Sequence, residues 1–175
     1  VNEVDPGVEL AGYYEGASAV SGDYFRYDKV DDHHYAMIKC DISGHGVAAA
    51  LIMVQVATLY TSFFREWQTR RNGQSLTDLV VQVNDIIESM SFKGRFAAFT
   101  LGLLDTRSGE WRICNAGDNR VDILDGTSGR MDLHKLPDPP AAGVFPSDLV
   151  EMRGGFPEVK LKLKSGDTAI LYTDV

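Results

Sequence analysis

Apolar residues recur along this chain with two different periods, which divide it into strands and helices. Before residue 42 and after residue 94, apolar and polar residues tend to alternate, as is typical of strands buried on one face. Between these regions apolar residues recur every three or four positions, as on an amphipathic helix. The pattern predicts strands at residues 9–15, 21–30, 35–41, 96–105, 110–115, 121–124, 131–136, 159–163 and 168–173.

Two consecutive helices are predicted in the middle of the chain. The first covers residues 47–67, and its spacing predicts a buried face made of Ala50, Met53, Val54, Ala57 and Tyr60. The second covers residues 76–90 and begins after Ser75, a favourable N-cap whose acidic partner Asp78 stands three residues later. Its apolar side is predicted to consist of Leu79, Val80, Val83, Ile86 and Ile87.

The order of these elements predicts the class of fold. Strands, then two helices, then more strands indicate an α+β protein with mostly antiparallel sheet. A length of 175 residues favours a single domain spanning residues 1–175, and residues 137–155, rich in proline and glycine, are predicted to form a long loop. Because the chain begins with Val1 and stops within a predicted strand, we expect a domain truncated at its C-terminus and derived from a longer parent protein.

Charge and composition exclude several classes of function. The formal net charge is −8, whereas nucleic acids and anionic membranes select basic surfaces, so neither partner is expected and a metal-dependent nuclease is disfavoured. Cys40 and Cys114 lie in predicted strands without CxxC spacing, which favours two buried reduced thiols over a disulfide or zinc site. No apolar run approaches the ~18–20 residues that span a bilayer, and we expect a cytoplasmic location.

The stretch Asp41-Ile42-Ser43-Gly44-His45-Gly46 carries the clearest chemical signal. An apolar strand ends on the carboxylate of Asp41, and a helix begins directly beyond the turn. Glycines allow such a turn to adopt φ > 0 or to let another group approach closely. A carboxylate held at a strand end over this turn suits a site for a hard cation or for phosphate chemistry.

Asp23 and Asp174 share the context of Asp41, since each is flanked by apolar or aromatic residues that anchor it on a strand. Acids that converge at one edge of a sheet repel one another, and bound Mg²⁺ or Mn²⁺ relieves that repulsion. Two such ions ~3.5–4 Å apart can activate a water and clamp a phosphoryl group. Aspartates at strand ends are also common in solvated turns, so the residue types alone leave both interpretations open.

Four segments together resemble the metal-dependent serine/threonine protein phosphatases of the protein phosphatase 2C superfamily. The nearest match is the bacterial branch similar to sporulation stage II protein E and the stress-response sigma-regulator phosphatases. The resemblance covers essentially the whole chain, and its most specific block begins at Asp41. The segments are VSGDYF at 20–25, DISGHGVAAAL at 41–51, NAGDN at 115–119 and LYTD at 171–174.

The resemblance implies two antiparallel β-sheets sandwiched between antiparallel helix pairs, with two Mn²⁺ or Mg²⁺ ions bound at one end between the sheets. It implies that Asp41 bridges the ions and that the Ile42 carbonyl is a further ligand. Asp23 would bind one ion directly or through water, and Asp174 the other. His45 would orient metal-bound water or assist the leaving group, although a hydrogen-bonding role in the turn fits its position equally well.

The resemblance also implies an enzyme that hydrolyses phosphoserine or phosphothreonine on a regulatory protein, of the anti-anti-sigma type, by metal-activated water. A sensor or receiver domain is expected upstream in the parent chain. The alternative is a degenerate or truncated phosphatase domain that acts as a protein-binding module, because the chain ends at Val175, before the family's closing helix, last strand and last metal ligand.

Two further sets of residues have more ordinary interpretations. Asp118 and Arg120 stand where the family frequently has His and Pro, and Asp118 is expected near the mouth of the site. His33 and His34, beside Asp31, are expected to form a solvated hairpin turn rather than a metal cluster.

Overall fold

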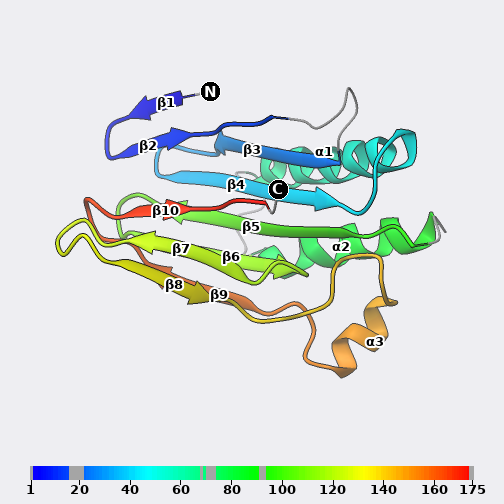
Figure 1. Ribbon diagram of the computed structural model, residues 1–175. Coiled ribbons are helices and arrows are strands. Elements are labelled where there is room, and N and C mark those ends of the chain that lie inside the picture. Colours follow the sequence, from blue (N-terminus) through cyan, green and yellow to red (C-terminus); the bar gives the residue numbers. More distant parts are fainter. Residues whose placement is uncertain (1, 16–21, 68, 70–73, 91–93, 174–175) are drawn as a thin grey trace.

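The computed structural model describes residues 2–15, 22–67, 69, 74–90 and 94–173. Its largest element is an antiparallel sheet of five strands in the order β3-β4-β5-β6-β9 (Figure 1). The strands are β3 (Asp23–Lys29), β4 (His34–Ile42), β5 (Ala97–Asp105), β6 (Glu110–Ala116) and β9 (Glu158–Lys162).

A second antiparallel sheet, in the order β10-β7-β8, lies against one face of the first. Its strands are β7 (Arg120–Leu124), β8 (Met131–Lys135) and β10 (Thr168–Ile170). Trp111 and Ile113 of β6 pack with Val121 of β7 in one buried cluster between the sheets. The expected pair of antiparallel sheets is therefore confirmed.

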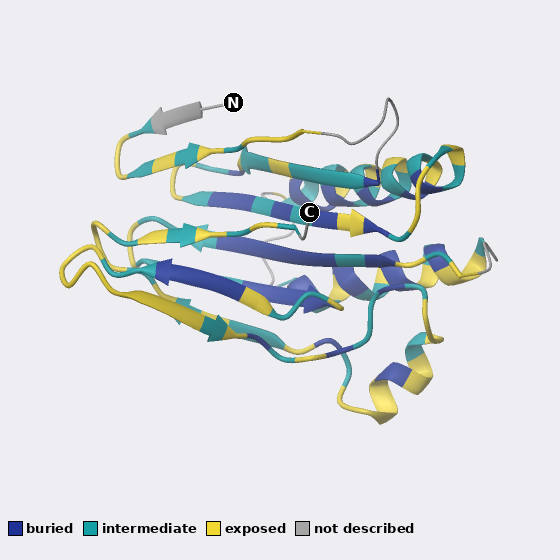
Figure 2. Ribbon diagram, viewed as in Figure 1, coloured by how far each residue is buried: buried dark blue, intermediate teal, exposed yellow. Residues whose placement is uncertain are grey.

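Two helices, α1 (Val47–Trp67) and α2 (Leu76–Ser89), cover the other face of the five-stranded sheet (Figure 1). Side chains from this helix pair and from that face of the sheet form the main hydrophobic cluster. Figure 2 colours buried positions dark blue, and they recur along both helices and along the central strands. The second helix pair that the resemblance implies is not present among the described residues.

The buried face of α1 differs from the predicted one. Of the five predicted positions, Tyr60 is buried, whereas Val54 is 54% exposed. The helix is apolar around much of its circumference, so two different stripes satisfy the three- and four-residue spacing and the period alone does not choose between them. The buried residues are Ala49, Ile52, Val56, Tyr60, Phe63 and Phe64.

The length of α1 also corrects the expectation that no apolar run approaches a membrane span. By length and composition alone, this helix is long and apolar enough to cross a membrane. A single such helix is weak evidence for a span, because the core helix of a globular domain passes the same test. The buried side of α1 belongs to the cluster that it shares with the sheet.

The start of α2 follows its predicted capping chemistry. Ser75 accepts a hydrogen bond from the backbone N–H of Thr77, and Asp78 accepts one from the N–H of Ser75 at 3.2 Å. Such a box satisfies donors that the first helical turn leaves open. A carboxylate from β9, Glu158, also accepts from the Leu76 N–H at 2.9 Å, which ties the helix start to the sheet.

Two elements were missed by the pattern. The predicted loop 137–155 contains a short helix, α3 (Ser147–Met152), which is held by the buried Asn84 of α2 through the Phe145 carbonyl at 3.0 Å and the Ser147 hydroxyl at 2.9 Å. Strand β1 (Asn2–Asp5) pairs with β2 (Val8–Ala11) as a separate hairpin. Both elements are too short to show a period of their own.

Candidate active site

The motif that begins at Asp41 forms the predicted strand, turn and helix. Strand β4 ends at Ile42, and the turn passes through Gly44 and Gly46 with φ of 78° and 83°. The carbonyl of Gly46 accepts the N–H of Ala50 at 3.1 Å and so begins the hydrogen bonding of α1. Positive φ at both positions explains why the turn requires glycine.

Asp23 and Asp41, far apart in the sequence, are directly opposite one another in the sheet. The register of β3 and β4 pairs their Cα atoms, and Asp41 in turn faces Ala98 of β5. Opposed side chains of an antiparallel pair lie on the same face with Cβ atoms ~4.5–5.5 Å apart, where two like charges destabilise the pair. This juxtaposition of carboxylates has the donor chemistry that a hard cation requires.

The absence of a side chain at Gly22 lets this residue lie directly against the buried backbone of Ile42. A Cβ at this position would lie 2.6 Å from the Ile42 oxygen and 3.3 Å from the Gly44 oxygen. The Ile42 N–H donates to the Gly22 carbonyl at 3.1 Å, so the two segments are also bonded to each other. The Ile42 carbonyl, beside the Asp23–Asp41 pair, is an oxygen donor of the kind that a divalent cation takes.

The turn is braced from the segment that precedes β5. The Ser43 N–H donates to the Phe96 carbonyl at 2.9 Å, and the Ser43 hydroxyl accepts the Phe96 N–H at 2.8 Å. Arg95 donates from Nη1 to the Ser43 carbonyl at 2.8 Å and occupies the space where a side chain at Gly44 would project. Sequence reasoning missed this arginine, because its role depends on strand pairing.

The other predicted site residues are placed as follows. The side chain of His45 is exposed on the turn, and no hydrogen bond joins it to another residue in the described part of the chain. Asp174 lies outside the described residues. The segment just before it, Leu171 to Thr173, lines a cavity of about 360 Å³ together with Asp23 and Lys39. Among the described residues, no three His, Cys, Asp or Glu side chains form a metal-binding group.

Asp118 has a specific partner that sequence reasoning did not identify. It forms an ion pair with Lys39 of β4, with 2.6 Å between Nζ and Oδ2, and accepts a hydrogen bond from the Thr100 hydroxyl at 2.7 Å. Cys40 follows Lys39 on β4. Burial raises the pKa of the Cys40 thiol, and the charges of Asp41 and Asp23 raise it further. Cys40 and Cys114 are both buried and unbridged, as predicted.

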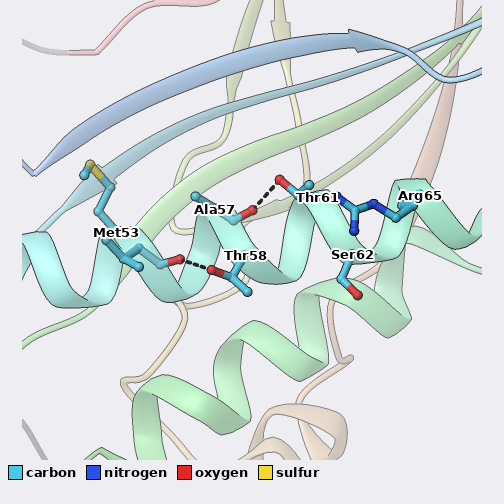
Figure 3. Close-up of a pocket in the computed structure, with 7 residues that line it drawn as sticks. Met53, Ala57, Thr58, Thr61, Ser62 and Arg65 are labelled. Atoms are coloured by element: carbon cyan, nitrogen blue, oxygen red, sulfur yellow. Dashed lines mark hydrogen bonds between the residues drawn. The ribbon is translucent and has the colours of Figure 1, made fainter.

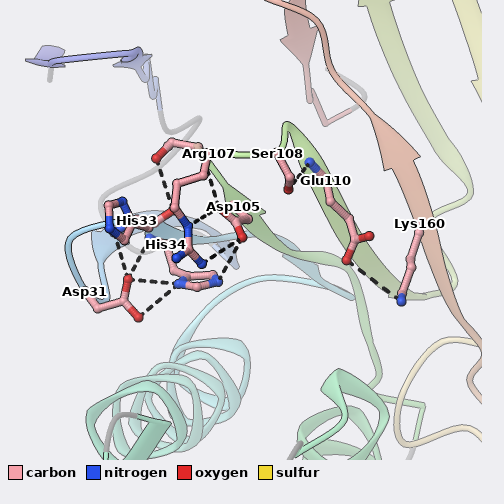
Figure 4. Close-up of polar contacts among 9 residues, drawn as sticks. Asp31, His33, His34, Asp105, Arg107, Ser108, Glu110 and Lys160 are labelled. Atoms are coloured by element: carbon pink, nitrogen blue, oxygen red, sulfur yellow. Dashed lines mark hydrogen bonds and ion pairs between the residues drawn. The ribbon is translucent and has the colours of Figure 1, made fainter.

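Two other polar or hollow regions lie away from this pair of aspartates. At the opposite end of β4, Asp31 accepts from the backbone N–H groups of His33 and His34, both at 2.8 Å, and His34 also faces Asp105 (Figure 4). This is the predicted hairpin turn. A shallow groove follows α1 from Met53 to Arg65 (Figure 3).

Comparison with known proteins assigns the chain to a family. The sequence profile described as Stage II sporulation protein E (SpoIIE) matches residues 31–174. The chain belongs to the SpoIIE family. The chain is also similar to the phosphoserine phosphatase RsbP of Bacillus subtilis (strain 168), with 37% identity over 57 residues, which is 33% of this chain and 14% of RsbP.

Solved structures show the same fold. The RsbU and RsbW domains of Rv1364c from Mycobacterium tuberculosis match with a TM-score of 0.68 and 23% identity, over 91% of this chain and 40% of that one. The PP2C phosphatase domain of SpoIIE from Bacillus subtilis matches with a TM-score of 0.66 and 17% identity, over 87% and 41%. RsbX, solved in complex with magnesium, matches with a TM-score of 0.64 and 14% identity, over 86% and 65%. The SpoIIE-family chain therefore spans less than two thirds of each of these relatives.

Proposed function

We propose that this chain is a metal-dependent serine/threonine protein phosphatase domain that removes phosphate from phosphoserine or phosphothreonine on a regulatory protein. The observation that carries the proposal is the register of β3 and β4, which opposes Asp23 and Asp41 on one face of the sheet, directly before Ile42. Membership of the SpoIIE family and the PP2C fold support the same activity.

In this proposal the carboxylates of Asp41 and Asp23 and the Ile42 carbonyl would hold the Mn²⁺ or Mg²⁺ ions. Asp174, beyond the described residues, is proposed as a further ligand. The crystallisation of RsbX with magnesium supports a divalent ion. When bound, such ions lower the pKa of a water and neutralise charge on the phosphoryl group.

In this proposal, side chains of the protein position the substrate and transfer protons. His45 is exposed on the turn next to the carboxylate pair, where its imidazole can give a proton to the leaving serine or threonine oxygen. The hydrogen bonds of Ser43 with Arg95 and Phe96 fix this turn on the segment before β5, so the groups on the turn need little reorganisation during the reaction.

We further propose a phosphorylated protein of the anti-anti-sigma type as substrate, a sensor or receiver domain elsewhere in the parent chain, and a cytoplasmic location. The similarity to RsbP and to the RsbU domain of Rv1364c supports a regulatory partner. The second candidate function is a protein-binding module with little turnover, which applies if the metal ligands beyond the described residues are deficient.

The test is Mn²⁺-dependent release of phosphate from a phosphoserine peptide, with and without the substitution Asp41→Asn. Loss of a metal ligand removes several kcal/mol of transition-state stabilisation, and each ~1.4 kcal/mol is a factor of ten, so kcat/KM should fall at least about 100-fold. Asp132→Asn is the matched control, because Asp132 is a largely exposed carboxylate on β8 whose ion pair within the described part of the chain is with His134.

Equal rates for wild type and Asp41→Asn would refute the mechanism. No turnover by the wild type, together with retained binding of a phosphorylated partner, would favour the protein-binding module instead.

A further inference from the structure

Lys39 places a cation on the face of the sheet that carries the two aspartates. It lies two residues before Asp41 on β4, and its register partners are Phe25 of β3 and Thr100 of β5. Alternate residues of a strand share a face, so Lys39 and Asp41 both point between the two sheets. The Lys39 side chain is only 12% exposed. A cation in this position is unexpected, because it competes with a metal ion for the same carboxylates.

The ammonium group of Lys39 is bound by acceptors from two distant segments. It pairs with Asp118, in the loop after β6, and it donates a hydrogen bond to the carbonyl of Tyr172, beyond β10. The Asp118 side chain is 16% exposed and is itself fixed by Thr100. Lys39 therefore joins the five-stranded sheet to the last described segment, which follows β10.

The contacts of Lys39 with Tyr172 and Asp118 both concern the carboxylates of the proposed metal site. The carbonyl that Lys39 holds belongs to Tyr172, two residues before Asp174 in the sequence. The carboxylate that pairs with the Lys39 ammonium is that of Asp118, which balances its charge. Buried ions are stable only when paired in this way.

We propose that Lys39 and Asp118 are positioning residues of the metal centre, an inference that rests on the proposed function. Lys39 fixes the chain that leads to Asp174 against β4, and Asp118 keeps the ammonium away from Asp23 and Asp41. The departure from the usual histidine at position 118 and the lysine at position 39 thus form one paired feature of this chain.

A positioning role and a purely electrostatic role predict opposite effects of removing the ammonium. If Lys39 acted only as a repulsive charge, Lys39→Met would tighten Mn²⁺ binding. If Lys39 positions the Tyr172 segment, the same substitution weakens binding, as the loss of groups that orient metal ligands typically does by about 10–100-fold.

The experiment measures the Kd for Mn²⁺ by titration calorimetry on the intact protein, as wild type, Lys39→Met, Asp118→Asn and the double variant. We expect Lys39→Met to raise the Kd at least about tenfold and to reduce amide hydrogen-exchange protection at residues 168–173. Asp118→Asn should also raise the Kd, because the released ammonium turns toward Asp41. In the Lys39→Met background, Asp118→Asn should have no further effect.

Lys29→Met is the matched control, since Lys29 forms an ion pair with Asp5 at 2.7 Å at the other end of β3. It should leave the Kd unchanged. The double variant leaves neither side chain as an unpaired ion, so it is expected to fold even if a single variant does not. Its Kd for Mn²⁺ should match that of Lys39→Met. If Lys39→Met does not fold, the Kd of the double variant should still exceed the wild-type value at least about tenfold.

Mn²⁺ binding by Lys39→Met or the double variant as tight as that of the wild type, or tighter, would overturn the positioning role while leaving the proposed function intact. An equal effect of Asp118→Asn with and without Lys39 would overturn the pairing. Absence of Mn²⁺ binding by the wild type would refute the proposed function, and with it this inference.

Discussion

Substitution of Gly22 by alanine tests whether the close approach of β3 to the Asp41 turn is required. The new Cβ would lie 2.6 Å from the carbonyl oxygen of Ile42 and 3.1 Å from its Cβ. The first distance is shorter than real Cβ contacts allow, and the atom is backbone, so it cannot rotate away. The start of β3 must therefore shift, and Asp23 follows Gly22 directly.

The size of the effect follows from the kind of contact. Adding a methyl group to a well-packed site costs typically about 1–3 kcal/mol. For a domain of this size each kcal/mol lowers Tm by roughly 2–4 °C, so Tm should fall by about 2–12 °C. Because the methyl group also covers the Ile42 carbonyl and displaces Asp23, the Kd for Mn²⁺ should rise at least about tenfold.

The assay compares Tm without metal and the Kd for Mn²⁺ in Gly22→Ala and in a control, Gly102→Ala. A Cβ at Gly102 would lie 2.5 Å from Nε1 of the buried Trp111, away from the carboxylate pair. The control should lose stability to a similar extent but bind Mn²⁺ as the wild type does. If Gly22→Ala loses stability and keeps its affinity, the Ile42 carbonyl and the position of Asp23 do not determine metal binding.

Two further predictions concern charge and burial. Burial opposes ionisation of Glu158, but the hydrogen bonds from Arg112 and from the Leu76 N–H outweigh burial and hold the pKa of Glu158 below the ordinary 4.5. The ionised carboxylate therefore stabilises the fold above pH 4.5, and this contribution is lost as the pH falls through the lowered pKa. Glu158→Gln should lower Tm at neutral pH by removing about 1–3 kcal/mol, and the difference from wild type should shrink in acid; a difference that is constant with pH would contradict this. Burial raises the pKa of Cys114 to about 12 and also raises that of Cys40. Neither thiol should therefore react with Ellman's reagent at pH 8 until the protein is unfolded in denaturant. Rapid reaction of the native protein would refute the burial of the two thiols.

Local chemistry was sufficient to predict most elements. The capping pair Ser75 and Asp78 located the start of α2, and the alternation of residues located most strands within a few positions of their observed bounds. The glycine turn after Asp41 was predictable because its conformation depends on its own residues. These features depend on interactions between residues close in the sequence, which the pattern records directly.

The order and type of the elements, and the family motif at Asp41, can thus be read from the amino-acid sequence. Three features required the folded chain: Val54 of α1 faces outward, Asp23 opposes Asp41, and Lys39 pairs with Asp118. Each depends on the register or packing of segments distant in the sequence, because a shift of one residue in strand pairing would move every side chain of the strand to the other face.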